Sequence, residues 1–374
     1  MGDACINGKP VTLQAACAEA ARLLAASRFP LIAGLGTDMA GARAAIALAR
    51  RLGAAVDHMH SAALLKNLEV MRDAGWMVTT PAEARLRADC LLLVGAGLTS
   101  AWLELPQRLS AVAALEEKDA SRRVVWLCPG GDAKALAKGA NVEVVGRDEV
   151  DLPILLAALR ARVAGRPIGK TPLPQSAIDA LAGNLQAARF GVAVWSASSG
   201  IDALAIEMLC GLVKDLNAKT RFSGLPLPPG DNGAGVLEAC GWTIGYPIRT
   251  GLRAGADAQH DAEHDAEHDP WRFDAPRLVD SGEADCVLWI SAYRPVVPPW
   301  TRNVRTIALI TPDARLRRPA QVQIAVGRPG VDHDSIEHMT SIGALGSIVA
   351  AAPSAAVSVT RAISDIAAAL PAGV

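Results

Sequence analysis

The stretch "RFPLIAGLG" at residues 28–36 is similar to "RFGVAVWSA" at residues 189–197, and this repetition is the main indication of the fold. Both stretches begin with Arg-Phe, continue as an apolar run and end at small residues that favour a turn. Two further pairs recur in the same order, "ADCLLLVGA" (88–96) with "ADCVLWISA" (284–292) and "RRVVWLCPG" (122–130) with "VRTIALITP" (304–312). One pair alone is no more than chance similarity among buried strands, but three pairs in one order indicate a repeated α/β unit.

Segments with helical periodicity separate these apolar runs. The stretch "AGARAAIALARRL" at residues 40–52, for example, has the spacing of an amphipathic helix. Continuous apolar strands that alternate with helices indicate parallel sheets covered on both faces. We therefore predict an α/β chain made of two Rossmann-like doubly wound domains.

The repeats also suggest where the domains lie along the chain. We place the first α/β domain at residues 1–168 and the second at residues 169–330, because the stretch 164–176 is rich in Pro and Gly. The second domain contains a long loop region, 225–283, whose length indicates a functional or interface role. Residues 331–374 end in a helical pattern whose apolar face needs cover, so we expect this C-terminal segment to pack back on the first domain.

Composition limits the partners that the protein can have. The 374 residues include 37 Lys and Arg against 38 Asp and Glu, a balance that favours a small-molecule or protein partner over nucleic acid or a membrane surface. No apolar run is long enough to span a membrane, and the first residues do not resemble a signal peptide. The seven cysteines form no CxxC pair, which is typical of a reduced, cytoplasmic protein without a thiol-based metal site.

Two local patterns resemble binding motifs. The stretch "GLGTDMAG" (34–41) follows a strand and opens a helix, but Met39 stands where a dinucleotide fingerprint has glycine, so a tight turn is favoured. The stretch "HDAEHDAEHD" (260–269) spaces His260, His264 and His268 four residues apart, which could hold a metal on a helix. Because this acidic repeat has no apolar face, we interpret it as a solvated loop.

Longer stretches carry a resemblance to a known family. They are residues 6–35, residues 51–96 and, most specifically, "NGAGVLEACGWTIGYP" at 232–247. The last stretch matches a family pattern at six positions, namely Asn232, Gly235, Trp242, Gly245, Tyr246 and Pro247. Together they resemble the B subunit of formylmethanofuran dehydrogenase, a member of the molybdopterin oxidoreductase superfamily. The resemblance implies a molybdopterin-oxidoreductase-like fold.

The departures from that family concern its redox chemistry. Within "DHMHSAALLKNL" (57–68) the resemblance places Ala63, preceded by Ser61 and Ala62, where the redox family has the Cys or selenocysteine that ligates tungsten or molybdenum. A methyl group cannot supply that soft anionic ligand. The family's four-cysteine segment has no counterpart near Cys5, and "VDHDSIEHM" (331–339) replaces a family run. We therefore expect no metal ligand, no redox centre and no catalytic residue in this chain.

With these losses the chain is similar to the B subunit of the formyltransferase/hydrolase complex of methylotrophic bacteria. The resemblance implies a non-catalytic structural component, with an amidohydrolase-like A subunit, a C subunit and a formyltransferase D subunit as partners. Such a complex converts formyl-tetrahydromethanopterin to formate through a methanofuran-like carrier, in one-carbon (formaldehyde) oxidation. The alternative is a formylmethanofuran dehydrogenase-type molybdenum or tungsten oxidoreductase whose metal ligand is not recognised.

The matched positions define a vestigial cleft, emptied of its metal, that could contact the methanofuran-like carrier. Its five candidate residues are Ser61, Ala63, Lys66, Asn232 and Thr243. Of these, Ala63 is expected to be a packing element, and the other four offer hydroxyl, amide or ammonium groups.

Overall fold

The computed structural model describes residues 4–105, 122–132, 142–146, 151–197, 200–253 and 265–372. The chain forms two compact units, each assembled from separate stretches of sequence. Unit 1 consists of Met1–Ser61, Gly230–His338 and Leu345–Val374, and unit 2 consists of Ala62–Pro229 and Met339–Ala344. Among the residues described, no helix combines the length and the apolar character needed to cross a bilayer.

Unit 1 is built on a nine-stranded sheet in the order β11-β10-β4-β3-β12-β13-β14-β1-β2. The strands are β1 (Ala4–Ile6), β2 (Lys9–Pro10), β3 (Pro30–Gly36), β4 (Ala55–His58), β10 (Thr250–Leu252), β11 (Ala266–His268), β12 (Cys286–Ser291), β13 (Arg305–Ile310) and β14 (Val322–Ala325). The five strands from β4 to β14 are parallel, and antiparallel strands close the two edges. The central strands are buried apolar runs because helices cover both faces of the sheet.

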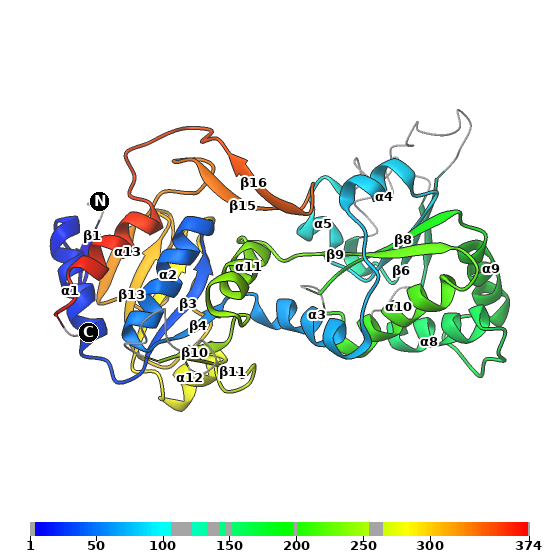
Figure 1. Cartoon of the computed structure of the whole chain (residues 1–374), viewed down its shortest axis with the longest axis horizontal. Helices are drawn as coiled ribbons and strands as arrows, with labels where there is room; N and C mark the ends of the chain where they lie inside the picture. The colour runs from blue at the N-terminus through cyan, green and yellow to red at the C-terminus, as the bar shows by residue number, and fades with distance from the viewer. Residues whose placement is uncertain are drawn as a thin grey trace. The chain divides into compact units, whose positions relative to one another are not determined.

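The helices of unit 1 are α1 (Leu13–Ala25), α2 (Met39–Leu52), α11 (Gly233–Ile244), α12 (Ala275–Ser281) and α13 (Val359–Ala368). Polar side chains start several of them: Thr12 caps α1, Asp38 caps α2 and Ser358 caps α13. In Figure 1 the red α13 lies beside the blue α1 and α2, and residues of these helices are in contact. The C-terminal segment thus returns to the N-terminal helices, which cover its apolar face. A two-stranded sheet, β15 (Ser335–Met339) with β16 (Ala344–Ile348), precedes α13.

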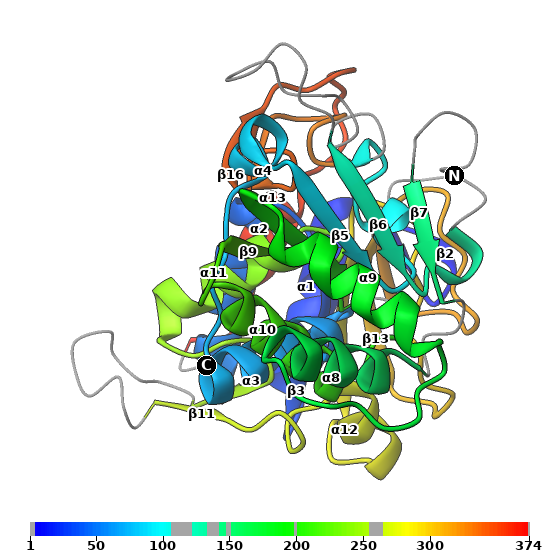
Figure 2. The same cartoon turned by 90° about the vertical axis from the view of Figure 1, so that its right-hand side faces the viewer.

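Unit 2 is built on a five-stranded parallel sheet in the order β7-β6-β5-β8-β9. Its strands are β5 (Cys90–Val94), β6 (Arg123–Leu127), β7 (Val142–Val145), β8 (Phe190–Ser196) and β9 (Arg221–Leu227). Its helices are α3 (Ser61–Ala74), α4 (Pro81–Arg87), α5 (Leu98–Ala101), α8 (Leu152–Val163), α9 (Gln175–Gln186) and α10 (Ala203–Leu216), with a short 3₁₀ turn η1 at Gly130–Asp132. Figure 2 shows β5, β6 and β7 side by side and α8, α9 and α10 grouped together.

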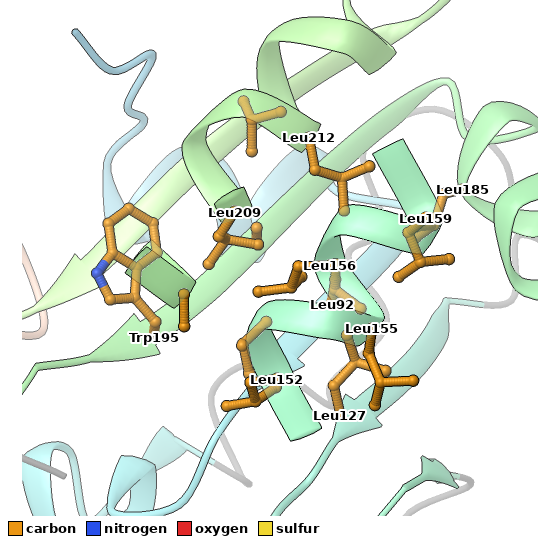
Figure 3. Close-up of a cluster of buried hydrophobic side chains, with 14 of the residues drawn as sticks. Leu92, Leu127, Leu152, Leu155, Leu156, Leu159, Leu185, Trp195, Leu209 and Leu212 are labelled. Atoms are coloured by element: carbon orange, nitrogen blue, oxygen red, sulfur yellow. The ribbon is translucent and has the colours of Figure 1, made fainter. Parts of the chain in front are cut away.

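The core of unit 2 explains why its strands read as unbroken apolar runs. Leucines of α8, α9 and α10 pack against Leu92, Leu127 and Trp195 on one face of the sheet (Figure 3). On the other face, Trp102 and residues of α4 and α5 pack against Trp126 and its neighbours. Burying a leucine contributes roughly 1.5–3 kcal/mol, so this two-sided core is the main stabilising term of the unit.

The two sheets have equivalent central strands. The three sequence pairs correspond to β3 with β8, β12 with β5, and β13 with β6. Their registers agree as well, because Cys286 lies opposite Pro30 and Arg305 in unit 1 just as Cys90 lies opposite Gly191 and Arg123 in unit 2. The orders β4-β3-β12-β13-β14 and β9-β8-β5-β6-β7 are therefore the same order of equivalent strands.

The equivalent strands follow one another along the chain in a different order in each unit. Unit 1 begins with β3 and β4 and adds β12, β13 and β14 after unit 2 is complete, whereas unit 2 begins with β5, β6 and β7 and ends with β8 and β9. The units are thus related by a circular permutation of strands. This confirms two Rossmann-like sheets but not the consecutive division at residues 168 and 169, because β3 pairs with β12 and β8 pairs with β5 across that boundary.

Candidate functional site

The polar side chains of unit 1 gather where the order of its strands reverses. From β3 the chain continues to β4 on one side, while β12, β13 and β14 follow one another on the other side. In doubly wound sheets ligands bind at the carboxyl edge beside such a switch point. The residues that follow β3, β4 and β12 all emerge at this edge, because those strands are parallel.

A cluster of three charged or titratable side chains lies at this edge. His60 follows β4, Asp231 precedes α11, and Arg294 follows β12. The Nε of Arg294 donates to Asp231 Oδ1 at 2.9 Å and to Oδ2 at 2.8 Å, and His60 Nε2 lies 2.8 Å from the same Oδ2. Burial alone would raise the pKa of Asp231, but the hydrogen bonds from His60 and Arg294 outweigh it and lower this pKa to about 2.

The contacts of this cluster fix what each group can do. The Asp231 side chain is only 1% exposed and both of its oxygens are occupied, so it is not a free general base. The Nη2 of Arg294 lies 3.1 Å from His60 Nε2. Because a guanidinium only donates, His60 Nε2 either accepts from Arg294 or carries a proton for Asp231. Within this cluster, the side chains of His60 and Arg294 are partly exposed to solvent.

His58, at the end of β4, supports this cluster from within the fold. The backbone N–H of His60 donates to His58 Nδ1 at 3.0 Å, so the imidazole proton is on Nε2, which lies 3.1 Å from the carbonyl oxygen of Asp231. Burial, and to a smaller extent the neighbouring His60, lowers the pKa of His58 to about 4. This neutral histidine therefore positions Asp231 and is not a proton carrier near neutral pH.

Ser61, His58 and Asp57 have the residue types of a hydrolase triad but not its geometry. The Ser61 hydroxyl contacts the Asp57 carboxylate and accepts the backbone N–H of His58 at 3.0 Å, so it makes no hydrogen bond with the imidazole. Ser61 is 1% exposed and cannot reach a substrate. We conclude that Ser61 holds the turn between β4 and α3.

Asp57 is a buried carboxylate on the same strand. It accepts the backbone N–H of Ala275 at the start of α12 at 2.8 Å, and Arg249 Nε lies 3.5 Å from its Oδ1. Burial raises the pKa of Asp57 to about 6, against the lowering effect of the Arg249 guanidinium. This network joins β4 to α12 inside unit 1.

Asn232, one of the predicted cleft residues, also has a structural role. Its amide nitrogen donates to Thr37 O at 2.9 Å, and its amide oxygen accepts the N–H of His338 at 2.9 Å. It therefore ties the turn after β3 to the C-terminal half of β15. In the same turn Asp38 accepts the N–H of Gly41 at 2.9 Å, so the α2 N-terminus already holds a carboxylate, in agreement with a tight turn rather than a phosphate site.

The other three predicted residues have contacts with other parts of the chain and not with this cluster. Ala63 and Lys66 are on α3 in unit 2, where Ala63 is a member of the apolar core and Lys66 Nζ donates to Ile201 O at 2.6 Å. Thr243, on α11 in unit 1, donates its hydroxyl to Ala239 O of its own helix. Of the five candidates, only Ser61 and Asn232 belong to the network around Asp231.

The residues that sequence reasoning did not select are Asp57, His58, His60, Asp231 and Arg294. Each has a weak signal, since the histidines stand directly after an apolar strand and Asp231 directly precedes Asn232. Arg294 follows the "ADCVLWISA" stretch by two residues, which is the loop position expected for a carboxyl edge. Their meeting depends on β3 pairing with both β4 and β12, which no local pattern encodes.

The thiols do not fit a tungsten or molybdenum site. None of the seven cysteines, all of which lie in the described ranges, forms a disulfide. Burial raises the pKa of Cys90, Cys240 and Cys286 to about 12, so none of these three is a ready thiolate ligand. In the described part of the chain, no group of three or more His, Cys, Asp or Glu side chains is arranged to hold a metal. His268 lies in β11 with Nδ1 3.0 Å from Arg249 O, whereas His260 and His264 lie outside the described residues.

Comparisons with known proteins show which family the chain resembles. No protein-family model matches the chain. The B subunit of the formyltransferase/hydrolase complex Fhc of Methylorubrum extorquens is 34% identical over 328 residues, which are 87% of this chain and 85% of that protein. The B subunit of the tungsten-containing formylmethanofuran dehydrogenase 2 of Methanocaldococcus jannaschii is 26% identical over 64% of this chain and 57% of its own length.

A solved structure shows similarity to the same complex over nearly the whole chain. A chain of the formyltransferase/hydrolase complex FhcABCD from Methylorubrum extorquens, crystallised in complex with methylofuran, superposes with a TM-score of 0.83 at 31% identity. The match covers 97% of this chain and 97% of that one.

Proposed function

The chain belongs to the family of the B subunit of the formyltransferase/hydrolase complex, and from this premise we propose that it is a non-catalytic structural component of such a complex. The complex would convert formyl-tetrahydromethanopterin to formate in the cytoplasm, with a methanofuran-like carrier holding the formyl group between the two steps. The observation that carries this proposal is the likeness of the whole chain to one component of that assembly, in both sequence and fold.

The local chemistry supports a structural role. Ser61 is buried, the carboxylate of Asp231 is saturated by Arg294 and His60, and the thiols of Cys90 and Cys240 are buried with raised pKa values. A nucleophile paired with a free base, the usual requirement for hydrolysis, is therefore not assembled by these residues. The tungsten-containing relatives share only part of their length with this chain, and the donor set here does not fit their metal.

We propose that the partners are an amidohydrolase-like A subunit, a C subunit and a formyltransferase D subunit. We further propose that the methanofuran-like carrier contacts this chain at the carboxyl edge of the nine-stranded sheet. The side chains of Arg294 and His60 are partly exposed there, although both also bind Asp231. Lys66, Asn232 and Thr243 use their polar groups in hydrogen bonds within the chain. Arg294→Ala should then weaken carrier binding by about tenfold, and Arg361→Ala, an exposed arginine of α13, is the control.

The test of the main proposal is reconstitution with the candidate partners. We expect the chain to co-purify with the amidohydrolase-like and formyltransferase proteins at a fixed ratio, and the complex to release formate. Metal analysis of the purified chain separates the proposal from the oxidoreductase alternative. Stoichiometric tungsten or molybdenum, an iron–sulfur absorption band, or failure to assemble with either partner would contradict it.

A further inference from the structure

A second concave site lies in unit 1, at the opposite end of the parallel strands from the carboxyl-edge cluster. It is a pocket of about 220 Å³ formed by the segment that leads into β13 and the segment that leads into β14. Val304 and Thr306 line it at the amino end of β13, and Pro319 lines it shortly before β14. None of the residues of the His60–Asp231–Arg294 cluster lines this pocket.

Three guanidinium groups dominate the chemistry of the pocket. Arg302, Arg317 and Arg318 are exposed and line it, and no lining residue is acidic. Within the described part of the chain, none of the three forms an ion pair with a carboxylate. Most other arginines of unit 1 are paired, for example Arg305 with Asp285 and Arg328 with Asp313. Like charges in one concavity repel each other, and this repulsion is relieved when an anion enters.

The pocket is held in shape before any ligand arrives. Arg302 Nη1 donates to the carbonyl oxygen of Asp280 at 2.8 Å, and its guanidinium packs so closely on Gly282 that an added Cβ there would lie 2.4 Å from Nη2. Pro298 and Pro319 restrict the backbone on both sides. Because Arg302 is held in place, it loses less conformational entropy on binding, which favours affinity.

The walls of the pocket contain apolar area as well as charge. Trp300 is buried beside it, and Val304 and Leu316 are half-buried in its lining. Its volume is below the 300–1,000 Å³ that small-molecule sites usually have, so it suits one or two side chains better than a whole metabolite. Arginine and tryptophan are also the residues enriched where protein partners anchor each other.

We propose that this arginine pocket (Arg302, Arg317 and Arg318) binds the carboxylates of an acidic segment of a partner protein in the complex. The inference rests on the proposed function, because it places the chain in a multi-subunit complex. Charge complementarity selects the occupant: guanidinium groups pair with carboxylates in two-point hydrogen bonds, and the apolar wall takes the methylene groups of Asp or Glu side chains.

Cross-linking in the assembled complex identifies the occupant directly. Arg317→Lys and Arg318→Lys keep the charge and add an amine, which a water-soluble carbodiimide joins to a carboxylate in contact with it. We expect peptides that link residue 317 or 318 to an Asp or Glu of another chain of the complex. Arg315→Lys is the matched control, since Arg315 is in the same segment but bonds to Pro312 O and Ala314 O and does not line the pocket.

Charge reversal tests the same inference by affinity. The double variant Arg317→Glu with Arg318→Glu should weaken association of the chain with its partners by about tenfold or more, and the loss should shrink at high salt. Arg315→Glu should have little effect, and an unchanged melting temperature of each isolated variant shows that folding is intact.

The outcomes separate this inference from the proposed function. An intact complex in which 317 and 318 link only within this chain, or no more than the 315 control, overturns the acidic-segment inference alone. Tight binding of pyrophosphate at the pocket without any cross-link to a partner chain also overturns it, since the site then serves a free anion. Failure of the native chain to join any partner overturns the proposed function and this inference together.

Discussion

The two units of the chain have equivalent sheets but different carboxyl edges. In both, an aspartate before one central strand accepts two backbone N–H groups from the Arg-Phe that opens the next strand of the sheet. Asp285 accepts those of Arg28 and Phe29, each at 3.2 Å, and Asp89 accepts those of Arg189 and Phe190 at 2.9 and 3.0 Å. This aspartate clamp explains why the sequence pairs keep their flanking polar residues.

The difference lies at the other end of the same strands. Register matches Gly34 and His58 of unit 1 with Trp195 and Pro226 of unit 2. Unit 1 shifts register between β3 and β12 beyond Trp289, whereas β8 and β5 pair without interruption. The apolar strand pattern thus builds the sheet in both units, and only in unit 1 does a register shift accompany a cluster of polar side chains at the carboxyl edge.

The largest effect is expected at the irregularity itself. Gly34 has φ +82°, and a Cβ there would lie 2.5 Å from the carbonyl oxygen of Ile290. Gly34→Ala therefore combines backbone strain with a clash, and should cost about 3 kcal/mol or more of unfolding free energy. Gly245→Ala is the matched control, because Gly245 has φ +74° with nothing within 4 Å, and should cost only about 1 kcal/mol.

Chemical denaturation of the two glycine variants measures this difference. If Gly34→Ala is no more destabilising than Gly245→Ala, the bulge tolerates a side chain. The contrast between the two units would then not depend on Gly34.

The next effect is a pH dependence of stability in unit 1, where Asp57 and His58 act in opposite directions. The equivalent positions in unit 2 are the apolar residues Leu225 and Pro226. The pKa of His58 is lowered to about 4, so the unfolded chain binds the proton first and His58 favours unfolding as the pH falls from about 6.5 to 4. The pKa of Asp57 is raised to about 6, so the folded chain binds the proton first and Asp57 disfavours folding as the pH rises from about 4 to 6.

The two pH dependences of stability largely cancel in the native chain. A substitution that removes one of the two groups should therefore reveal the dependence that the other causes. Asp57→Asn should leave stability that increases between pH 4 and 6.5, and His58→Asn should leave stability that decreases between pH 4 and 6. Each change amounts to roughly 2–3 kcal/mol, the order of magnitude that such pKa shifts imply. Denaturation midpoints over a pH series measure both, and equal slopes in the two variants would contradict the opposing roles.

A smaller effect is expected from the aspartate clamps. Asp285→Ala and Asp89→Ala each remove the acceptor for two backbone donors, and should cost about 1–2 kcal/mol. The loss of unfolding free energy should be larger for Asp285→Ala, because Asp285 also binds the Ser27 hydroxyl and Arg305. Its pKa is lowered by these partners despite burial, so its contribution is present above about pH 4 and is lost as the pH falls further. Equal costs would show that the backbone donors alone matter.

The sequence predicted the parts of this molecule that depend on local pattern. Apolar runs preceded by Arg or Asp and followed by a turn residue identified β3, β5, β6, β8, β12 and β13, and their order of recurrence identified two Rossmann-like sheets. The permutation escaped detection because β3 has apolar neighbours whichever strand it pairs with, so its pairing with β12 leaves no local signal.

Residues of the candidate site were predicted only where they lie within one recognisable stretch of sequence. Ser61 and Asn232 were selected from their stretches, but Asp231 and Arg294, which are 63 positions apart, meet only in the folded chain. Ala63 and Ser61 are two residues apart in sequence, yet Ser61 belongs to the polar network of unit 1 and Ala63 to the apolar core of unit 2. Sequence spacing alone cannot separate these two environments.

The smallest effect is expected at Ala63, which tests whether the position matched to the metal ligand is only a packing site. Ala63 is 9% exposed within the core that contains Leu152 and Trp195. Ala63→Ser adds one hydroxyl, so formyl transfer and hydrolysis by the assembled complex should be nearly unchanged. Ala63→Trp is the packing control, and should lower stability and the yield of complex through an overpacking cost of roughly 1–3 kcal/mol or more.

The measurement is turnover of formyl-tetrahydromethanopterin to formate, with the yield of intact complex determined in parallel. A packing site predicts that turnover per assembled complex is insensitive to both substitutions, because only the amount of complex changes. A site that takes part in the chemistry predicts the reverse, since a serine hydroxyl beside a reacting group changes its hydrogen bonding without affecting assembly. A large fall in turnover for Ala63→Ser with full assembly would therefore rule out the structural role that we assign to this segment of α3.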